Sequence, residues 1–144
     1  MFIDYLYTHP NAKLRFHKSD MQLHIESDAA YLVSPGAKST TSGYFHISNS
    51  VYNNSPPPLI YAPVQVECQL LKHVVTSAEE AETGTVFHNC KISIGINKMI
   101  QALGKPQGTT PLKTDNPTEV SCSNATLKEN PSKTGDMRWY FLQD

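Results

Sequence analysis

The chain has 144 residues and a mass of 16.0 kDa, which fits one domain with a single hydrophobic core. Lysine and arginine total 12 against 13 aspartate and glutamate residues, so the formal net charge of -1 does not mark the chain as a nucleic-acid binder. The three cysteines form no C-x-x-C pair, which argues against a disulfide framework and a zinc site and indicates reduced thiols.

The first residues lack the basic and apolar regions of a signal peptide, and no stretch approaches the roughly 18 apolar residues of a membrane span. We therefore expect an intracellular protein that is not secreted and has no membrane partner.

Residues 1–20 show no clean hydrophobic period and are expected to form an extended lead-in to a domain at residues 21–144. Apolar positions from Gln22 to Val33 predict a strand with Asp28 near its middle or end. A turn at residues 34–36 follows. Alternating residues from Ser42 to Ser48 predict a second, half-buried strand.

A third strand is expected from Leu59 to Gln69. Pro63 within it marks an edge position or a bulge, because proline cannot donate a hydrogen bond to a neighbouring strand. Thr76 and Ser77 each begin a capping-box pattern, T-x-x-E and S-x-x-E, so a helix should begin at Ala78.

Beyond about Asn89 the pattern of this helix is ambiguous. Isoleucines at positions 92, 94 and 96 alternate as in a strand, and Gly95 would weaken a helix by about 1 kcal/mol relative to alanine. The sequence Gly-Lys-Pro after Leu103 is nevertheless a sound helix stop.

The last elements each present an acidic residue. A short buried strand is expected from Thr110 to Thr114, with Asp115 at its carboxyl end, where open α/β sheets bind their ligands. Asn116 and Pro117 then favour the start of a helix. A final helix is expected at residues 136–144, with Asp136 at its N-terminus.

Asp28 and Asp115 are candidate metal ligands, since converging carboxylates suit Mg²⁺ or Mn²⁺. A buried carboxylate such as Asp28 costs several kcal/mol unless a cation or hydrogen bonds compensate. The alternative for Asp28 is a strand-end residue that accepts backbone hydrogen bonds, and for Asp115 and Asp136 it is a helix cap. Glu79, Glu80 and Glu82 compete for one further position, although the first two lie where helix capping explains them.

Four segments of the chain resemble, in order and spacing, the ribonuclease H domain that ends the polyprotein of copia-type LTR retrotransposons. They are YLYTHPNAKLRFHKSDMQLHIESDAAYL, ECQLLKHVVTSAEEAETGTVFHN, LKTDN and DMRWYFLQD, and the resemblance covers nearly the whole chain. It implies an α/β fold with a ribonuclease H-like mixed sheet, in which three antiparallel strands are followed by helix-strand-helix units. The family has a helix across the ambiguous region, so we expect the helix to continue to Leu103 with a kink near Gly95.

The resemblance implies an endonuclease that hydrolyses the RNA strand of RNA–DNA hybrids by a two-metal-ion mechanism during retrotransposon reverse transcription. Two Mg²⁺ ions, with Mn²⁺ as a substitute, would be held by Asp28, Glu82, Asp115 and Asp136, where Glu82 matches the second glutamate of the family's A-E-A-E pattern. Implied partners are the hybrid and the adjacent reverse transcriptase domain, in a cytoplasmic particle or the nucleus. The candidate substrate contacts are Ser27, Asn116 and Lys133.

The chain also departs from the family. Many members have a histidine two positions before the last aspartate, where this chain has Thr134, and they are more basic just upstream. His73 is the histidine to test first as a replacement acid or base. Two alternatives therefore stay open: a catalytically degenerate remnant that binds nucleic acid or serves a structural role, and a metal-dependent DNA nuclease or strand-transfer enzyme of the same fold.

Overall fold

The computed structural model of the chain describes residues 2–50 and 61–115. Its elements are α1 (Phe2–Thr8), β1 (Gln22–Ser34), β2 (Lys38–Ser48), β3 (Pro63–Leu70), α2 (Ala78–Ala102) and β4 (Leu112–Lys113). The helices expected after Asn116 and at residues 136–144 lie outside the described residues.

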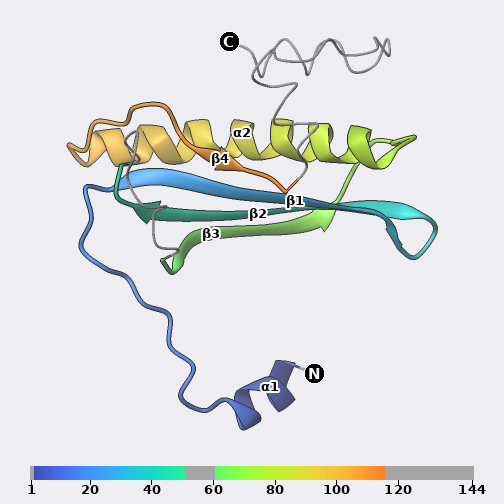
Figure 1. The fold of residues 1–144 in the computed structure, drawn as a ribbon, viewed down its shortest axis with the longest axis horizontal. Helices are drawn as coiled ribbons and strands as arrows, with labels where there is room; N and C mark the ends of the chain where they lie inside the picture. The colour runs from blue at the N-terminus through green and yellow to red at the C-terminus, as the bar shows by residue number, and fades with distance from the viewer. Residues whose placement is uncertain (1, 51–60, 116–144) are drawn as a thin grey trace.

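The four strands form one mixed sheet in the order β3-β2-β1-β4. β1 and β3 each pair antiparallel with β2, whereas β4 pairs parallel with β1. Figure 1 shows α2 lying along one face of this sheet. The predicted α/β class and the order of three antiparallel strands, a helix and a further strand are confirmed.

The core lies between the sheet and α2. Leu23 and Ile25 of β1 pack there with Phe45 of β2, and α2 contributes Ile96 and Ile100. Leu23 and Ile25 are two residues apart, as one face of a strand requires, whereas Ile96 and Ile100 are four apart, as one face of a helix requires. The alternating isoleucines therefore belong to a helix, with Ile96 buried and Ile94 exposed.

The predicted start and end of α2 are confirmed, but the prediction of a kink near Gly95 is wrong. Ser77 caps the helix, with its Oγ accepting a hydrogen bond from the Glu80 amide at 3.0 Å, and Glu80 Oε2 accepts one from the Thr76 amide at 2.7 Å. Gly104 at φ +78° ends it in the left-handed conformation that glycine favours. Between these ends α2 is one unbroken helix that includes Gly95, and Figure 1 shows it straight along its length.

β3 begins at Pro63 and is the outer strand of the sheet, so proline occupies an edge position. The pairing of β2 with β3 also shifts register between Phe45 and His46, which leaves Val64 as an extra residue beside Pro63. Both features that the sequence suggested for Pro63 are present. The expected start of the strand at Leu59 lies outside the described residues.

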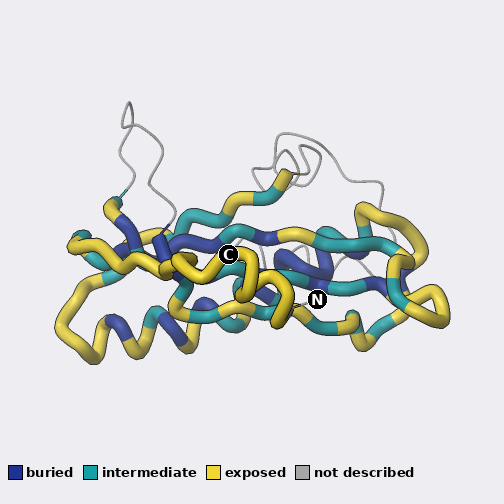
Figure 2. Tube along the Cα trace, turned by 90° about the horizontal axis from the view of Figure 1, so that it is seen from below, coloured by how far each residue is buried: buried dark blue, intermediate teal, exposed yellow. Residues whose placement is uncertain are grey.

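The lead-in is not wholly extended, because residues 2–8 form α1. Tyr5 stacks on His9 with ring centroids 4.3 Å apart, and Thr8 Oγ1 donates a hydrogen bond to the Asp4 carbonyl at 3.0 Å. Figure 1 shows α1 apart from the sheet, and in Figure 2 this segment is exposed. Since burial imposes no pattern on such a helix, its sequence has no hydrophobic period. Neither described helix has the length and apolar composition of a membrane span.

Candidate metal centre

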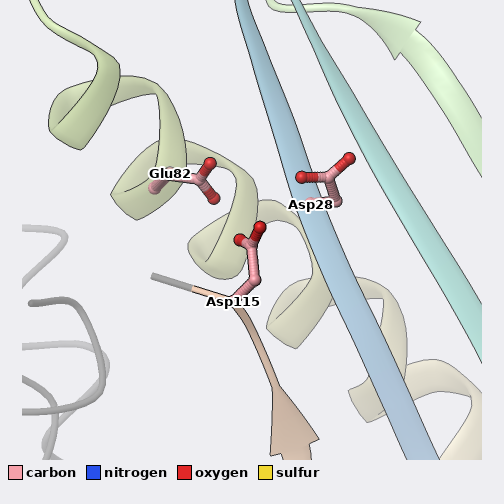
Figure 3. A group of neighbouring side chains, drawn as sticks. All are labelled: Asp28, Glu82 and Asp115. Carbon is pink, nitrogen blue, oxygen red and sulfur yellow. The ribbon is translucent and has the colours of Figure 1, made fainter. Parts of the chain in front are cut away.

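Asp28, Glu82 and Asp115 come together although they belong to distant parts of the chain. Asp28 lies in the middle of β1, Glu82 in the second turn of α2, and Asp115 just after β4. One carboxylate oxygen of each lies within 4.8 Å of those of the other two. Figure 3 shows the three side chains converging from the strand, the helix and the turn.

The parallel pairing of β1 and β4 explains how Asp115 reaches Asp28. Ile25 pairs with Leu112 and Glu26 with Lys113. The same offset, continued by two residues, aligns Asp115 with Asp28. The third carboxylate comes from α2, which packs on the core face of the sheet and carries Glu82 at its N-terminal end.

The donor atoms fit a hard divalent cation. The triad offers carboxylate oxygens, the ligands preferred by Mg²⁺ and Mn²⁺. Oxygens bound to one octahedral Mg²⁺ lie about 3–4 Å apart, because each metal–oxygen bond is about 2.1 Å long. The 4.8 Å limit of the triad is near this range and also suits oxygens shared between two ions.

The triad is accessible from solvent, because two of its three carboxylates are exposed. Asp28 and Asp115 are exposed, and Glu82 is half-buried with its Oε2 excluded from solvent. Asp28 and Asp115 also line a hollow of about 470 Å³ that extends over Tyr44 of β2 and Cys68 of β3. A ligand in this hollow would therefore lie directly beside two of the three carboxylates.

The lysine nearest to Asp115 in the chain pairs with a carboxylate outside the triad. This lysine is Lys113, and its Nζ lies 3.3 Å from Glu26 Oε2. Three carboxylates at such short separations repel one another, and a divalent cation would convert this repulsion into attraction.

The structure also distinguishes the three competing glutamates. Glu80 takes part in the helix cap, and Glu79 is exposed in the first turn. Glu82 is the one that meets the two aspartates. The expectation that capping accounts for Glu80 is thus confirmed by its hydrogen bonds.

The remaining expected site residues are Ser27, which the structure describes, and residues that lie beyond Asp115. Ser27 is 5% exposed, its Oγ accepts a hydrogen bond from Asn89 Nδ2 at 2.9 Å, and it lines the hollow beside Asp28 and Asp115, so its contact with substrate stays a prediction. Asp136, Asn116 and Lys133, like Thr134, lie outside the described residues.

Cys68 lines the hollow beside the triad, whereas His73 and Cys90 are not among its lining residues. His73 lines a different hollow, between β3 and α2, together with Phe87 and His88. Cys68 and Cys90 are free thiols. Burial raises the pKa of the Cys90 thiol to about 11, so this side chain is a poor nucleophile at neutral pH.

Asn89 is a residue that the sequence patterns did not single out as part of the site. It is fully buried on α2 and donates hydrogen bonds to Ser27, the residue before Asp28 in β1, and to Ser42, the residue opposite Asp28 in β2. The signal that would have found it is its helical spacing, because Val86, Asn89, Ser93 and Ile96 form one buried face.

No protein-family model matches the chain, and comparisons with curated proteins and with solved structures find no match.

Proposed function

We propose that the protein is a divalent-metal-dependent endonuclease that cleaves the RNA strand of RNA–DNA hybrids. The observation that carries this proposal is the meeting of Asp28, Glu82 and Asp115, three carboxylates from three elements, within 4.8 Å. A mixed sheet with three antiparallel strands, a covering helix and an acidic turn after a parallel strand agrees with the ribonuclease H resemblance.

In this proposal the triad holds the ions and sets their position against the substrate. Such ions, when bound, lower the pKa of an attacking water and stabilise the leaving 3′ oxygen. Asp28 and Asp115 bind from the exposed side, and Glu82 binds from the half-buried side. Asp136 is the proposed fourth ligand, on the strength of the family motif alone.

The substrate assignment follows from the resemblance and from the chemistry of the hybrid. Recognition is sequence-independent, through phosphates and through the 2′-hydroxyl groups that distinguish RNA from DNA. The open hollow beside Asp28 and Asp115 supports access by a polymer backbone.

A cleavage assay on four labelled substrates of one sequence tests the proposal: RNA–DNA hybrid, duplex DNA, duplex RNA and single-stranded RNA. We expect cleavage of the hybrid RNA strand with Mg²⁺ or Mn²⁺ and none with a chelator. Tight hybrid binding without cleavage would overturn the proposal in favour of a non-catalytic remnant. Preferred cleavage of duplex DNA would overturn it in favour of a DNA nuclease.

Two glutamates of α2 give a matched pair of variants for this assay. Glu82→Gln should abolish cleavage, because it removes a metal ligand, whereas Glu79→Gln makes the same charge change three residues earlier in the exposed first turn and should leave cleavage intact. Equal activity in the two variants would contradict the role of Glu82.

A further inference from the structure

We propose that Asn89 is a positioning residue that fixes the strand of Asp28 against the helix of Glu82, and that metal binding by the triad depends on it. This inference rests on the proposed function, because it concerns the same three carboxylates. Asn89 acts through the backbone and side chains beside the carboxylates, by its hydrogen bonds to Ser27 and Ser42.

The hydrogen bonds of Asn89 reach β1, which carries Asp28, and the neighbouring strand β2. Its Nδ2 donates to Ser27 Oγ at 2.9 Å and to the Ser42 carbonyl at 2.9 Å. Ser27 precedes Asp28 in β1, and Ser42 is the residue paired with Asp28 across β2. Ser42 Oγ in turn donates to the Asp28 carbonyl at 2.9 Å. One amide group therefore holds the residue before Asp28 and the residue opposite it.

Asn89 also lies on the correct face of the helix for this role. It follows Glu82 by seven residues, which is close to two helical turns, so the two side chains leave α2 in nearly the same direction. A helix that rotates or slides over the sheet would break both bonds of Asn89 and would carry Glu82 away from Asp28 in the same movement.

Gly43 allows the close approach that these bonds require. A Cβ at this position would lie 2.5 Å from Asn89 Oδ1, which is far inside contact distance. The glycine lies between Ser42 and Tyr44 of β2, directly opposite Ser27. The absence of a side chain at position 43 thus makes room for the asparagine to reach the backbone of β2.

A positioning role explains the buried Asn89 side chain better than a general role in packing α2 against the sheet. Asn89 is 0% exposed, and an apolar side chain there would hold the helix through contacts that have no preferred direction. Hydrogen bonds are directional, and a buried amide loses free energy when its partners move. Asn89 therefore penalises small displacements that a hydrophobic contact tolerates.

The test measures the Mn²⁺ affinity of the folded protein, by electron paramagnetic resonance of free Mn²⁺, for wild type and Asn89→Ala. Loss of residues that orient metal ligands typically weakens metal binding by about 10–100-fold, and we expect a loss in this range. Ile100→Ala is the control, because it removes a buried side chain at the far end of α2 from Glu82. The control should lower the melting temperature and keep the wild-type Mn²⁺ affinity.

Wild-type affinity in folded Asn89→Ala, or an equal loss of affinity in Ile100→Ala, would overturn the positioning role and leave Asn89 as a general stability residue. Ser27→Ala is the milder variant to use if Asn89→Ala does not fold, since it removes one acceptor and leaves the bond to Ser42. It should weaken Mn²⁺ binding less than Asn89→Ala, and unchanged affinity would count against the proposal.

A crystal structure of the metal-free variant separates this inference from the proposed function. If the wild-type protein binds no Mn²⁺, the proposed function fails. The positions of the three carboxylates in the metal-free variant still show whether Asn89 holds them in place. We expect the oxygens of Asp28 and Glu82 in the variant to separate beyond the 4.8 Å limit of the wild-type triad. An unchanged triad in the variant would overturn the inference.

Discussion

Replacing Asp28 by asparagine removes one of three neighbouring negative charges and keeps the size of the side chain. In the metal-free protein this change should stabilise the fold, because Asp28 lies within 4.8 Å of two other carboxylates. In the presence of Mg²⁺ the variant should be less stable than the wild-type protein, because it lacks one of the carboxylates that bind the ion.

The magnitude follows from the separation. Two unit charges 4.8 Å apart repel by about 0.9 kcal/mol in water, and physiological salt reduces this to about 0.5 kcal/mol. Asp28 and Asp115 are exposed, so the value for water applies to this pair, and it is a lower bound for the pair of Asp28 with half-buried Glu82. Asp28 forms two such pairs, so Asp28→Asn should raise the metal-free unfolding free energy by about 1 kcal/mol. For a chain of this size that corresponds to a rise in melting temperature of about 3–5 °C.

Thermal melts with a chelator and with excess Mg²⁺ or Mn²⁺ measure both effects. At a free ion concentration about 100 times the dissociation constant, wild type should gain about 2.7 kcal/mol, so the order of stability reverses. The variant should also lose hybrid cleavage. Glu79→Gln is the control for the charge change. Asp28 is not a metal ligand if Asp28→Asn cleaves the hybrid at the wild-type rate, or if the ions stabilise it as much as they stabilise the wild-type protein.

Three further changes test the account of the fold. Gly95→Ala should raise the unfolding free energy by up to about 1 kcal/mol in urea denaturation, because Gly95 is exposed within α2 and a Cβ there meets nothing within 4 Å beyond its chain neighbours and the nearby backbone of the helix. A loss of stability would indicate a required kink. Ser77→Ala should cost about 1 kcal/mol in the same assay through loss of the helix cap, and no change would remove the cap from the account. Burial, with the neighbouring His24, lowers the pKa of His46 below its ordinary 6.5, so the unfolded chain binds the proton first and stability should fall as pH drops below about 6.5. His46→Gln should flatten that dependence in denaturation series on both sides of this pH, and an unchanged slope would assign it to other groups.

Local signals made most of the fold predictable. The alternation around Leu23 and Ile25 and the capping pattern of Ser77 and Glu80 act within a few residues, and the structure contains the corresponding strand and helix. The α1 helix escaped prediction because its residues are exposed and show no hydrophobic period. Gly95 misled the prediction because a lone glycine weakens a helix without bending it.

The site could be predicted only in part, because its geometry depends on distant pairings. The sequence indicates that Asp28 and Asp115 belong to strands or strand ends, but only the register of β1 against β4 aligns them. Helical spacing places Asn89 on the buried face of α2, but its role could not be assigned, since its partners Ser27 and Ser42 are 62 and 47 residues away in the chain. No sequence pattern near Asn89 indicates its contact with Ser27 or with Ser42.

The most direct test of the central claim is a crystal structure of the protein soaked in Mn²⁺, with the ion located by its anomalous scattering. We expect at least one ion about 2.1 Å from carboxylate oxygens of Asp28, Glu82 and Asp115. An empty triad at a Mn²⁺ concentration that saturates binding in solution, or ions bound only elsewhere, would contradict it.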